Sequence, residues 1–183
     1  MKPSPVQLLQ LVFDKVLVEL DPNHAPPEPY GISAPFSFNG VILRTAVGFA
    51  ELDGAPADAH LFEVSLELIV ENKKSKEKKK TQQFSPYLLH LKARCLVRLL
   101  KAASKLGPPQ DLAAVNGAAL IWSAMREQVA AITARMPAGQ ILLPTVHFQD
   151  LRTDLKASGN QLARDVPSSP EDGPALRLLD QVE

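Results

Sequence analysis

The chain has 183 residues, 45% of them hydrophobic and 22% charged, a composition typical of a globular protein rather than a disordered one. Its 20 Lys and Arg balance 20 Asp and Glu, so no global field would attract nucleic acid or an anionic membrane. The single cysteine, Cys95, excludes an internal disulfide framework and favours a reducing, cytoplasmic location.

The first predicted strand covers residues 6–20, which are apolar on both parities. Such a pattern is typical of a strand that is buried on both faces for part of its length. Asp14, Lys15 and Glu19 interrupt the run, which argues against a signal peptide, and no stretch reaches the roughly 20 apolar residues needed to span a bilayer. After the proline-dense connector DPNHAPPEPYG, a second strand is predicted over Gly40–Leu52.

Two further strands follow, HLFEVSLELIVE at residues 60–71 and YLLHLKARCLVRL at residues 87–99. Each alternates an apolar face with a charged one, glutamates in the first strand and His90, Lys92, Arg94 and Arg98 in the second. They are predicted to pair antiparallel, with opposite charges across the strands that are each worth about 0.2–1 kcal/mol.

The next predicted element is a long helix, because Ile121, Met125 and Val129 fall at helical spacing in an alanine-rich stretch, residues 113–134. Trp122 and Leu120 widen its apolar arc, which indicates more than one packing neighbour.

The sequence ILLPTVHFQDL, Ile141–Leu151, comes after this helix and is called the post-helix segment below. It is too apolar for an ordinary surface loop, and Pro144 prevents a continuous helix, so we expect an extended conformation. A second, shorter helix is predicted over Gln149–Ala157, and residues 158–183 have the composition of a flexible tail.

No catalytic or cofactor site is evident. His24, His60, His90 and His147 are far apart in sequence, without the paired spacing of a metal site, and Cys95 lies on an apolar strand face where an inert buried thiol is expected. The chain has no nucleophile elbow, phosphate loop or dinucleotide fingerprint. We therefore expect a protein that is not an enzyme and needs no metal or cofactor.

The one strong charge feature is a lysine cluster between the third and fourth strands: Lys73, Lys74, Lys76, Lys78, Lys79 and Lys80. It could contact phosphates, but it lacks the stacking aromatic residues that single-strand binders supply. A solvated hairpin tip is the favoured interpretation, and no nucleic-acid partner is expected.

Residues 115–151, VNGAALIWSAMREQVAAITARMPAGQILLPTVHFQDL, resemble the C-terminal half of the SecB family of export chaperones and their SecB-like relatives. The matching features are a helix opening near Asn116-Gly117, an Arg-Glu pair and a Leu-x-Pro-x-Val-x-Phe pattern, carried by Arg126, Glu127, Leu142, Pro144, Val146 and Phe148. DPNHAP is similar to the family's connector after the first strand. The resemblance covers roughly residues 6–157 and is specific in its last third.

This resemblance implies an α+β fold, with a four-stranded antiparallel sheet, one long helix and a shorter C-terminal helix. It implies a chaperone domain over residues 1–157 and a tail over 158–183. The family assembles as a homotetramer, a dimer of dimers with the long helices at the interface. Its activity is that of an ATP-independent holdase, which binds unfolded or nascent polypeptides and keeps preproteins competent for export by the SecA motor.

The resemblance also assigns residues. The post-helix segment would line an apolar groove against the sheet, with peptide-binding positions Val41, Leu43, Leu142, Leu143, Val146, Phe148 and Leu151. The oligomer interface would contain Leu89, Leu91, Ile121, Trp122, Met125 and Val129.

Two departures from the family pattern matter. SecA docks on an acidic sheet surface, whereas His90, with Lys92 and Arg94 beside it, stands where the family has an acidic residue. Arg152 replaces an aromatic groove residue. A chaperone or adaptor dedicated to one partner, such as an antitoxin, therefore stays open beside a general export factor.

Overall fold

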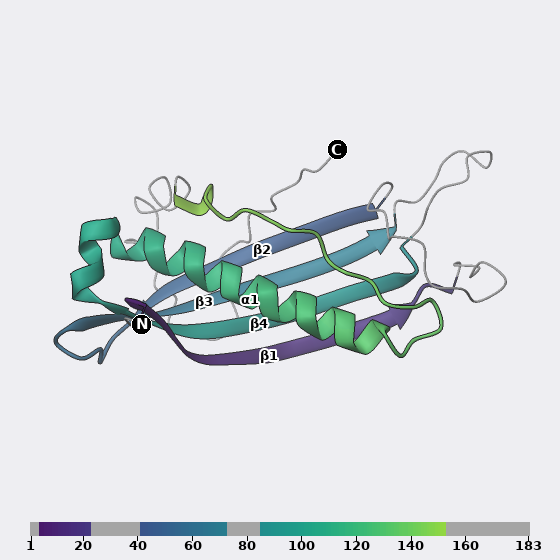
Figure 1. Cartoon of the computed structure of the whole chain (residues 1–183), viewed down its shortest axis with the longest axis horizontal. Coiled ribbons are helices and arrows are strands. Elements are labelled where there is room, and N and C mark those ends of the chain that lie inside the picture. Colours follow the sequence, from purple (N-terminus) through teal and green to yellow (C-terminus); the bar gives the residue numbers. More distant parts are fainter. Residues whose placement is uncertain (1–3, 23–40, 73–84, 153–183) are drawn as a thin grey trace, which may run out of the picture.

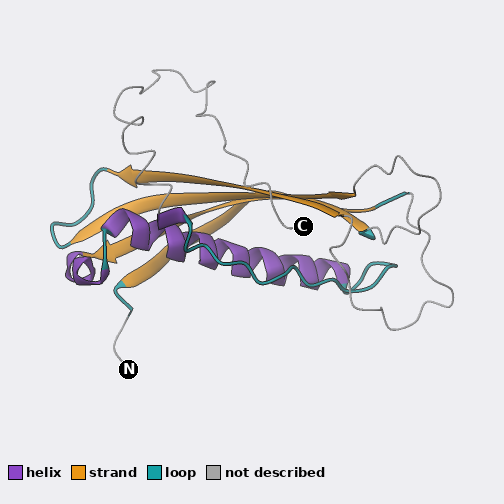
Figure 2. Cartoon of the chain, turned by 90° about the horizontal axis from the view of Figure 1, so that it is seen from above, coloured by secondary structure: helices purple, strands orange, loops and turns teal. Residues whose placement is uncertain are grey.

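The computed structural model describes residues 4–22, 41–72 and 85–152. Its elements are β1 (Val6–Leu20), β2 (Val41–Leu52), β3 (Ala59–Asn72), β4 (Tyr87–Leu100), the 3-10 helix η1 (Lys101–Leu106) and α1 (Pro109–Thr133). The strands form one antiparallel sheet in the order β1-β4-β3-β2, and α1 lies across one of its faces (Figures 1 and 2). The predicted α+β fold class, with a four-stranded sheet and one long helix, is confirmed.

Several predictions fall partly or wholly outside the described residues. The shorter C-terminal helix is described only at its start, where Leu151 and Arg152 are helical. The proline-dense connector after β1, the lysine cluster of residues 73–80 and the proposed tail over 158–183 are not described. Within the described residues, no helix is both long enough and apolar enough to cross a membrane.

The two central strands follow their sequence patterns. The apolar faces of β3 and β4 are buried almost without exception, whereas their charged faces are partly exposed. On the exposed face Glu67 accepts a hydrogen bond from His90 of β4 at 2.6 Å, and an ion pair joins Arg44 of β2 to Glu71 at 2.5 Å. The predicted antiparallel pairing of acidic and basic strands is thus confirmed, although exposed pairs of this kind contribute at most about 1 kcal/mol each.

The apolar residues of β1 fall on both parities because the strand contains two β-bulges. The expectation that this strand is buried on both faces for part of its length is wrong. The register with β4 shifts between Leu8 and Gln10 and again between Phe13 and Lys15. Each extra residue moves the side chains that follow it to the opposite face of the sheet. β1 is an edge strand, and none of its 15 side chains is fully buried.

The helix α1 begins at Pro109, which is earlier than the start expected near Asn116-Gly117. Proline is favoured in a first helical turn, because its missing N–H would have no partner there. Gly117 instead marks the point where α1 approaches the sheet: a Cβ atom at Gly117 would lie 2.6 Å from Cγ2 of Val64. Glycine therefore permits a close contact between the helix and β3.

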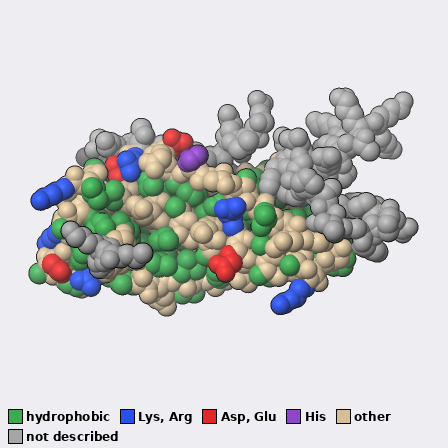
Figure 3. All heavy atoms as spheres, in the orientation of Figure 1, with side chains coloured by type: hydrophobic (Ala, Val, Ile, Leu, Met, Phe, Trp, Pro, Cys, Tyr) green, Lys and Arg blue, Asp and Glu red, His purple; other side chains and the backbone are tan. Residues whose placement is uncertain are grey.

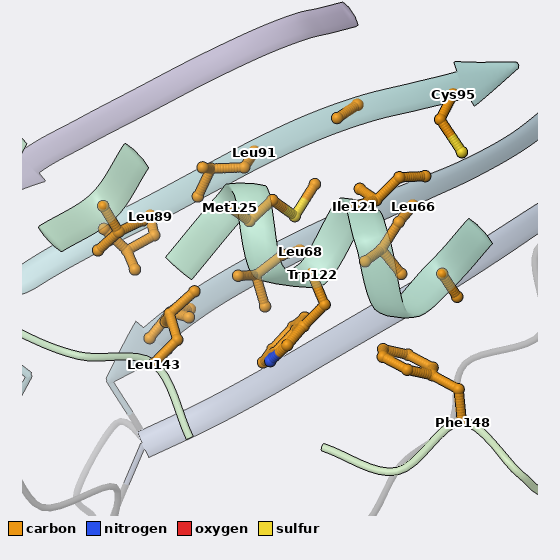
Figure 4. Close-up of a cluster of buried hydrophobic side chains, with 14 of the residues drawn as sticks. Leu66, Leu68, Leu89, Leu91, Cys95, Ile121, Trp122, Met125, Leu143 and Phe148 are labelled. Carbon is orange, nitrogen blue, oxygen red and sulfur yellow. The ribbon is translucent and has the colours of Figure 1, made fainter. Parts of the chain in front are cut away.

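The core lies between α1 and the inner face of β3 and β4, as Figure 4 shows for side chains from the helix, both strands and the post-helix segment. The largest of its fully buried side chains include Tyr87, Phe62, Leu66, Leu68, Leu91, Leu99, Ile121, Met125 and Leu143. Burial of an aliphatic side chain of this size stabilises the fold by about 1.5–3 kcal/mol relative to exposure.

A cluster of polar groups joins the ends of β1, β3 and β4. The Asn72 side chain donates to the Asp21 carboxylate and, at 3.0 Å, to the carbonyl of Ser85. The Ser85 N–H donates back to the Asn72 amide oxygen at 2.6 Å. Asp21 and Ser85 are buried, so these bonds satisfy groups that water does not reach. The three strand ends are therefore held in one register.

Candidate functional site

The post-helix segment runs back along α1, antiparallel to it, in the same layer as the helix (Figures 1 and 2). Two helix side chains hold its main chain: Arg126 Nε donates to the carbonyl of Leu143 at 2.9 Å, and Trp122 Nε1 donates to the carbonyl of Pro144 at 3.0 Å. From Ile141 to Phe148 the chain is neither helix nor strand, as its proline predicted. Side chains of α1, rather than a strand ladder, fix this path.

The turn that reverses the chain after α1 is fixed in the same way. Thr133 Oγ1 donates to the carbonyl of Val129 at 2.7 Å and accepts the N–H of Ile141 at 3.0 Å. Gly139 has a φ of 80°, which few other residues adopt without strain. The Tyr87 hydroxyl donates to its carbonyl at 2.9 Å, and burial raises the pKa of that phenol.

The side chains of the segment point in two directions. Leu143 and Phe148 are buried against the core, and the Phe148 ring packs edge-on against Trp122 with centroids 6.2 Å apart (Figure 4). Leu142 points the other way and is 58% exposed. Val146 and Leu151 lie between these extremes, half-buried against the core.

A half-buried apolar strip follows the β2 side of the core. Its β2 members lie on the inner face of the sheet, because Leu43, Val47 and Phe49 pair with residues of β3 whose side chains are fully buried. We define the apolar strip as these three residues together with Val146 and Leu151, all of which pack against the same core cluster. They are the half-buried apolar side chains on the β2 side of this cluster, and other half-buried apolar residues pack against it from β1 and from the turn after α1.

The structure brings six of the seven predicted peptide-binding residues to this part of the core. Leu43, Val146 and Leu151 belong to the apolar strip, and Val41, Leu143 and Phe148 are buried directly behind it in the same cluster. Leu142 is separate from that cluster. Sequence reasoning missed Val47 and Phe49, although their alternation with Ala46 and Gly48 on β2 was visible. Binding by any of these residues stays a prediction.

The six predicted interface residues have a different environment from the one expected. Leu89, Leu91, Ile121, Trp122, Met125 and Val129 all pack between helix and sheet inside one chain, where each is at most 4% exposed. A role for these six residues in an oligomer interface stays a prediction. The broad apolar arc of α1 has a simpler cause, since the helix packs against both the sheet and the post-helix segment.

The exposed apolar side chains are concentrated elsewhere. Of the eight large hydrophobic residues exposed in the described part of the chain, five belong to β1: Leu8, Leu9, Val16, Leu17 and Leu20. The outward side of α1 is also weakly polar, with Ala119, Leu120 and Ser123 exposed. Figure 3 shows the corresponding face of the molecule, where apolar side chains lie between scattered charges. The exposure of these apolar side chains on β1 was not predicted, because the bulges that decide which of its side chains face the core were not predicted.

The outer face of the sheet, opposite α1, is charged but locally neutral. Glu67 accepts from His90 Nε2, while Lys15 Nζ lies 2.9 Å from His90 Nδ1. Arg94 reaches both Asp14 at 3.3 Å and Glu63 at 3.9 Å. Acidic and basic groups thus neutralise each other across three strands, and the described residues present no continuous acidic surface there.

The described residues do not suggest catalysis. Cys95 is buried beneath α1, and that burial raises the pKa of its thiol to about 11, which keeps it protonated and unreactive. No group of three or more His, Cys, Asp or Glu in the described ranges could hold a metal ion. The arrangement instead offers apolar surface at two places, the apolar strip and β1.

The fold and this surface define an α+β protein whose core is bordered by half-buried apolar side chains, with no catalytic centre evident among residues 4–22, 41–72 and 85–152. No family model matches the chain, and no curated protein matches it. Among solved structures, it is similar to a SecB-like chaperone of Mycobacterium tuberculosis in complex with an antitoxin peptide. The two chains are 16% identical, with a TM-score of 0.37, and the alignment covers 77% of this chain and 90% of that one.

Proposed function

We propose that this protein is an ATP-independent chaperone, a holdase that binds unfolded or nascent polypeptides through the apolar strip. The observation that carries the proposal is the contrast in burial across the sheet: the inner faces of β3 and β4 are fully covered, whereas that of β2 is only half covered. The resemblance of residues 115–151 to the SecB family supports the same function.

The chemistry of the strip suits many clients. Burial of one client side chain contributes at most about 1.5–3 kcal/mol, and the entropy cost of association removes part of it. Such contacts are weak and non-directional, so they do not select a sequence. Binding becomes tight when one unfolded chain contacts several equivalent strips at once. A holdase of this kind therefore needs an assembly of several copies.

We propose that the copies form a homotetramer, arranged as a dimer of dimers, through surfaces other than the six side chains first predicted. The apolar residues of β1 lie on an edge strand, where a second chain can reach them. On the outward side of α1, Ala119, Leu120, Ser123 and Ala131 are exposed together with Gln110 and Glu127. Both surfaces are apolar enough to be covered in an assembly.

The charges on the outer face of the sheet indicate whether a client would be passed to the SecA motor. An acidic surface for the SecA motor would need carboxylates without partners, yet Glu63 and Glu71 pair with arginines and Glu67 accepts a hydrogen bond from His90. This observation favours the second candidate function, a chaperone or adaptor dedicated to one partner such as an antitoxin, over a general export factor.

The test is suppression of aggregation without ATP. A denatured reporter protein is diluted into buffer with the full chain, and light scattering is recorded for wild type, Val146→Asp and Thr145→Asp. Val146 belongs to the apolar strip, whereas its neighbour Thr145 is exposed outside it. We expect wild type and Thr145→Asp to suppress scattering and Val146→Asp to fail while remaining folded. Aggregation that proceeds normally with folded wild type would contradict the proposal.

A second reporter of unrelated sequence separates the two candidate functions. Suppression of both reporters supports a general holdase. If neither reporter is protected, while a single antitoxin-like peptide binds, the dedicated chaperone is supported instead.

A further inference from the structure

We infer that residues 175–182, which have the sequence ALRLLDQV and are called the tail segment below, dock on the apolar strip of the same chain and compete with clients for it. The inference rests on the proposed function and deepens it, because it names a regulation of the same site. Three features of the molecule carry it: the accessible surface of the strip, the place where the described chain leaves it, and the sequence of residues 153–183.

The apolar strip keeps part of its surface accessible in the single chain. Leu43, Val47 and Phe49 of β2 are half-buried, although the residues of β3 that pair with them are fully buried. Val146 and Leu151 pack against the same core cluster and are also half-buried. Apolar surface that water can reach is commonly covered by a partner, by a ligand or by another part of the chain.

The described chain ends at this strip. Leu151 is a strip residue, and Arg152, next to it, is the last described residue. Figure 1 shows the post-helix segment ending beside β2, beyond the edge of the sheet. Residues 153–174 separate Arg152 from the tail segment in sequence, and a chain of that length reaches up to about 70 Å when extended. Every residue of the strip is therefore within reach of the tail segment.

The tail segment has the residue spacing of an amphipathic helix that binds an apolar groove. Ala175, Leu178, Leu179 and Val182 fall at positions i, i+3, i+4 and i+7. In a helix this spacing places the four apolar side chains on one face, which is the pattern that apolar grooves recognise. Pro174, directly before the segment, is typical of the start of a helix. The segment thus carries the apolar face that the strip needs as a cover.

Charge favours the same contact. Residues 153–183 contain six acidic and three basic residues, whereas the whole chain contains 20 of each. The rest of the chain therefore has 17 basic and 14 acidic residues, a net charge opposite in sign. Within residues 4–22, 41–72 and 85–152, neither Arg126 nor Arg152 of this region belongs to an ion pair. Both can attract the carboxylates of residues 153–183 toward the strip.

The covalent link makes even a weak contact effective. Residues 158–174 are rich in Ser, Gly and Pro, a composition typical of a linker. A segment on such a linker meets its site at an effective concentration on the order of 1 mM. An intrinsic dissociation constant of about 0.1 mM would then fill about nine strips in ten and weaken the binding of a single client segment about tenfold.

This competition selects clients by length. A short apolar peptide has to displace the tail segment for the gain of one strip. An unfolded chain that contacts several strips of an assembly displaces several tail segments and still binds tightly, because its contacts add up. The tail segment would thus keep the strips covered until a long unfolded chain is present.

The first test measures client affinity in variants of the whole chain. The probe is reduced and alkylated α-lactalbumin with a fluorescein label, which stays unfolded, and its binding is followed by fluorescence anisotropy. The combined change Leu178→Asp and Leu179→Asp removes the apolar face of the tail segment. The control, Gln181→Asp with Ser168→Asp, alters the charge equally but leaves that face intact.

We expect the variant without the apolar face to bind the probe at least about fivefold more tightly than wild type, because its strips are no longer occupied. The control should bind like wild type. Wild-type or weaker affinity in the first variant would overturn the inference. Tighter binding by the control to the same extent would also overturn it, since charge alone would then explain the change.

The second test locates the tail segment by cross-linking in a Cys95→Ala background. Gln181→Cys is combined with Thr145→Cys, an exposed position next to Val146, or with Leu17→Cys on β1. We expect a bismaleimide to join Gln181→Cys to Thr145→Cys within one chain, with a yield that falls when the probe is added. Equal yield with Leu17→Cys, or cross-links only between copies, would overturn the inference.

Failure of the inference and failure of the proposed function give different results. If wild type and both tail variants bind the probe with one affinity, the holdase stands and the docking of the tail segment is wrong. If none of the three proteins binds the probe while all remain folded, the proposed function fails and the inference fails with it.

Discussion

Trp122 donates its indole N–H to the main-chain carbonyl of Pro144 at 3.0 Å, and its ring packs edge-on against Phe148. One side chain of α1 thereby holds the post-helix segment at two points, on either side of Val146. Pro144 has no N–H, so its carbonyl is its only main-chain hydrogen-bonding group, and Trp122 supplies a donor for it. The helix and the segment should accordingly behave as one unit.

The first prediction tests that unit. Trp122→Phe keeps an apolar ring but leaves the Pro144 carbonyl without its donor. Loss of the hydrogen bond and of ring volume should lower the free energy of unfolding by about 1–3 kcal/mol, measured by urea denaturation. Amide exchange should accelerate at Thr145–His147 more than in β3. Leu120→Ala, on the outward side of the same helix, is the control and should change the stability by less than about 1 kcal/mol. Unchanged exchange in the segment would contradict the proposed coupling.

The second prediction concerns the contact between Gly117 and Val64. Gly117→Ala should favour the helix by up to about 1 kcal/mol in intrinsic propensity, yet the added methyl would meet Val64. Since a Cβ atom there would lie 2.6 Å from Val64 Cγ2, we expect a net loss of about 1–3 kcal/mol. Combining it with Val64→Ala should recover part of that loss in a double-mutant cycle. Strict additivity of the two changes would show that the residues do not share this contact.

The third prediction is a pH dependence caused by Cys95. Burial raises the pKa of its thiol from 9.0 to about 11, so the folded state disfavours the thiolate that the unfolded state forms more easily. The stabilising contribution is therefore complete below about pH 9 and is lost as the pH rises through about 11.

The measurement is urea unfolding of wild type and Cys95→Ala between pH 8 and 11. Wild type should lose stability relative to the variant as the pH rises, by an amount on the order of 1–3 kcal/mol. Tyr87, whose pKa is also raised by burial, is present in both proteins and cancels in the comparison. A constant difference across this range would contradict the prediction. Folded wild type should also resist iodoacetamide at pH 8.

The fourth prediction addresses assembly. Val16 is 39% exposed on the apolar edge strand β1, so Val16→Lys should place a charge in any interface formed there. Native mass spectrometry should show a tetramer for wild type and smaller species for the variant, with the melting temperature of the subunit little changed. Leu142→Lys is the matched control, since Leu142 is more exposed but lies on the post-helix segment. A tetramer in Val16→Lys would direct attention to the outward side of α1.

The central strands were the most predictable part of the fold. In β3 and β4 every second residue is apolar and the others are mostly polar or charged. The alternation in the sequence therefore matches the alternation of buried side chains from Phe62 to Val70 and from Tyr87 to Leu99. β1 was predicted within its observed bounds but with the wrong environment. A bulge changes which parity faces the core, and the sequence around Leu9 and Asp14 gives no separate signal for it.

The candidate site was only partly predictable for a related reason. The proline in the post-helix segment predicted its irregular path, and the apolar residues around it predicted contact with the core. Which of them remain accessible depends on the hydrogen bonds from Trp122 and Arg126, which set the direction of each side chain. Trp122 was predicted to lie in an oligomer interface, because an apolar arc on a helix does not show whether a sheet, a loop or another copy of the chain covers it.

The polar cluster of Asn72, Asp21 and Ser85 bears on how this chain can change over evolution. It holds both ends of the connector formed by residues 73–84 and the start of the connector formed by residues 23–40, whose other end follows into Val41, the sheet partner of Asn72. Lengthening a loop whose ends are fixed costs little, only about 0.6 kcal/mol for each doubling. Insertions, deletions and fused peptides at these two positions should leave the strand register intact, so a lineage can add new recognition elements there without rebuilding the scaffold.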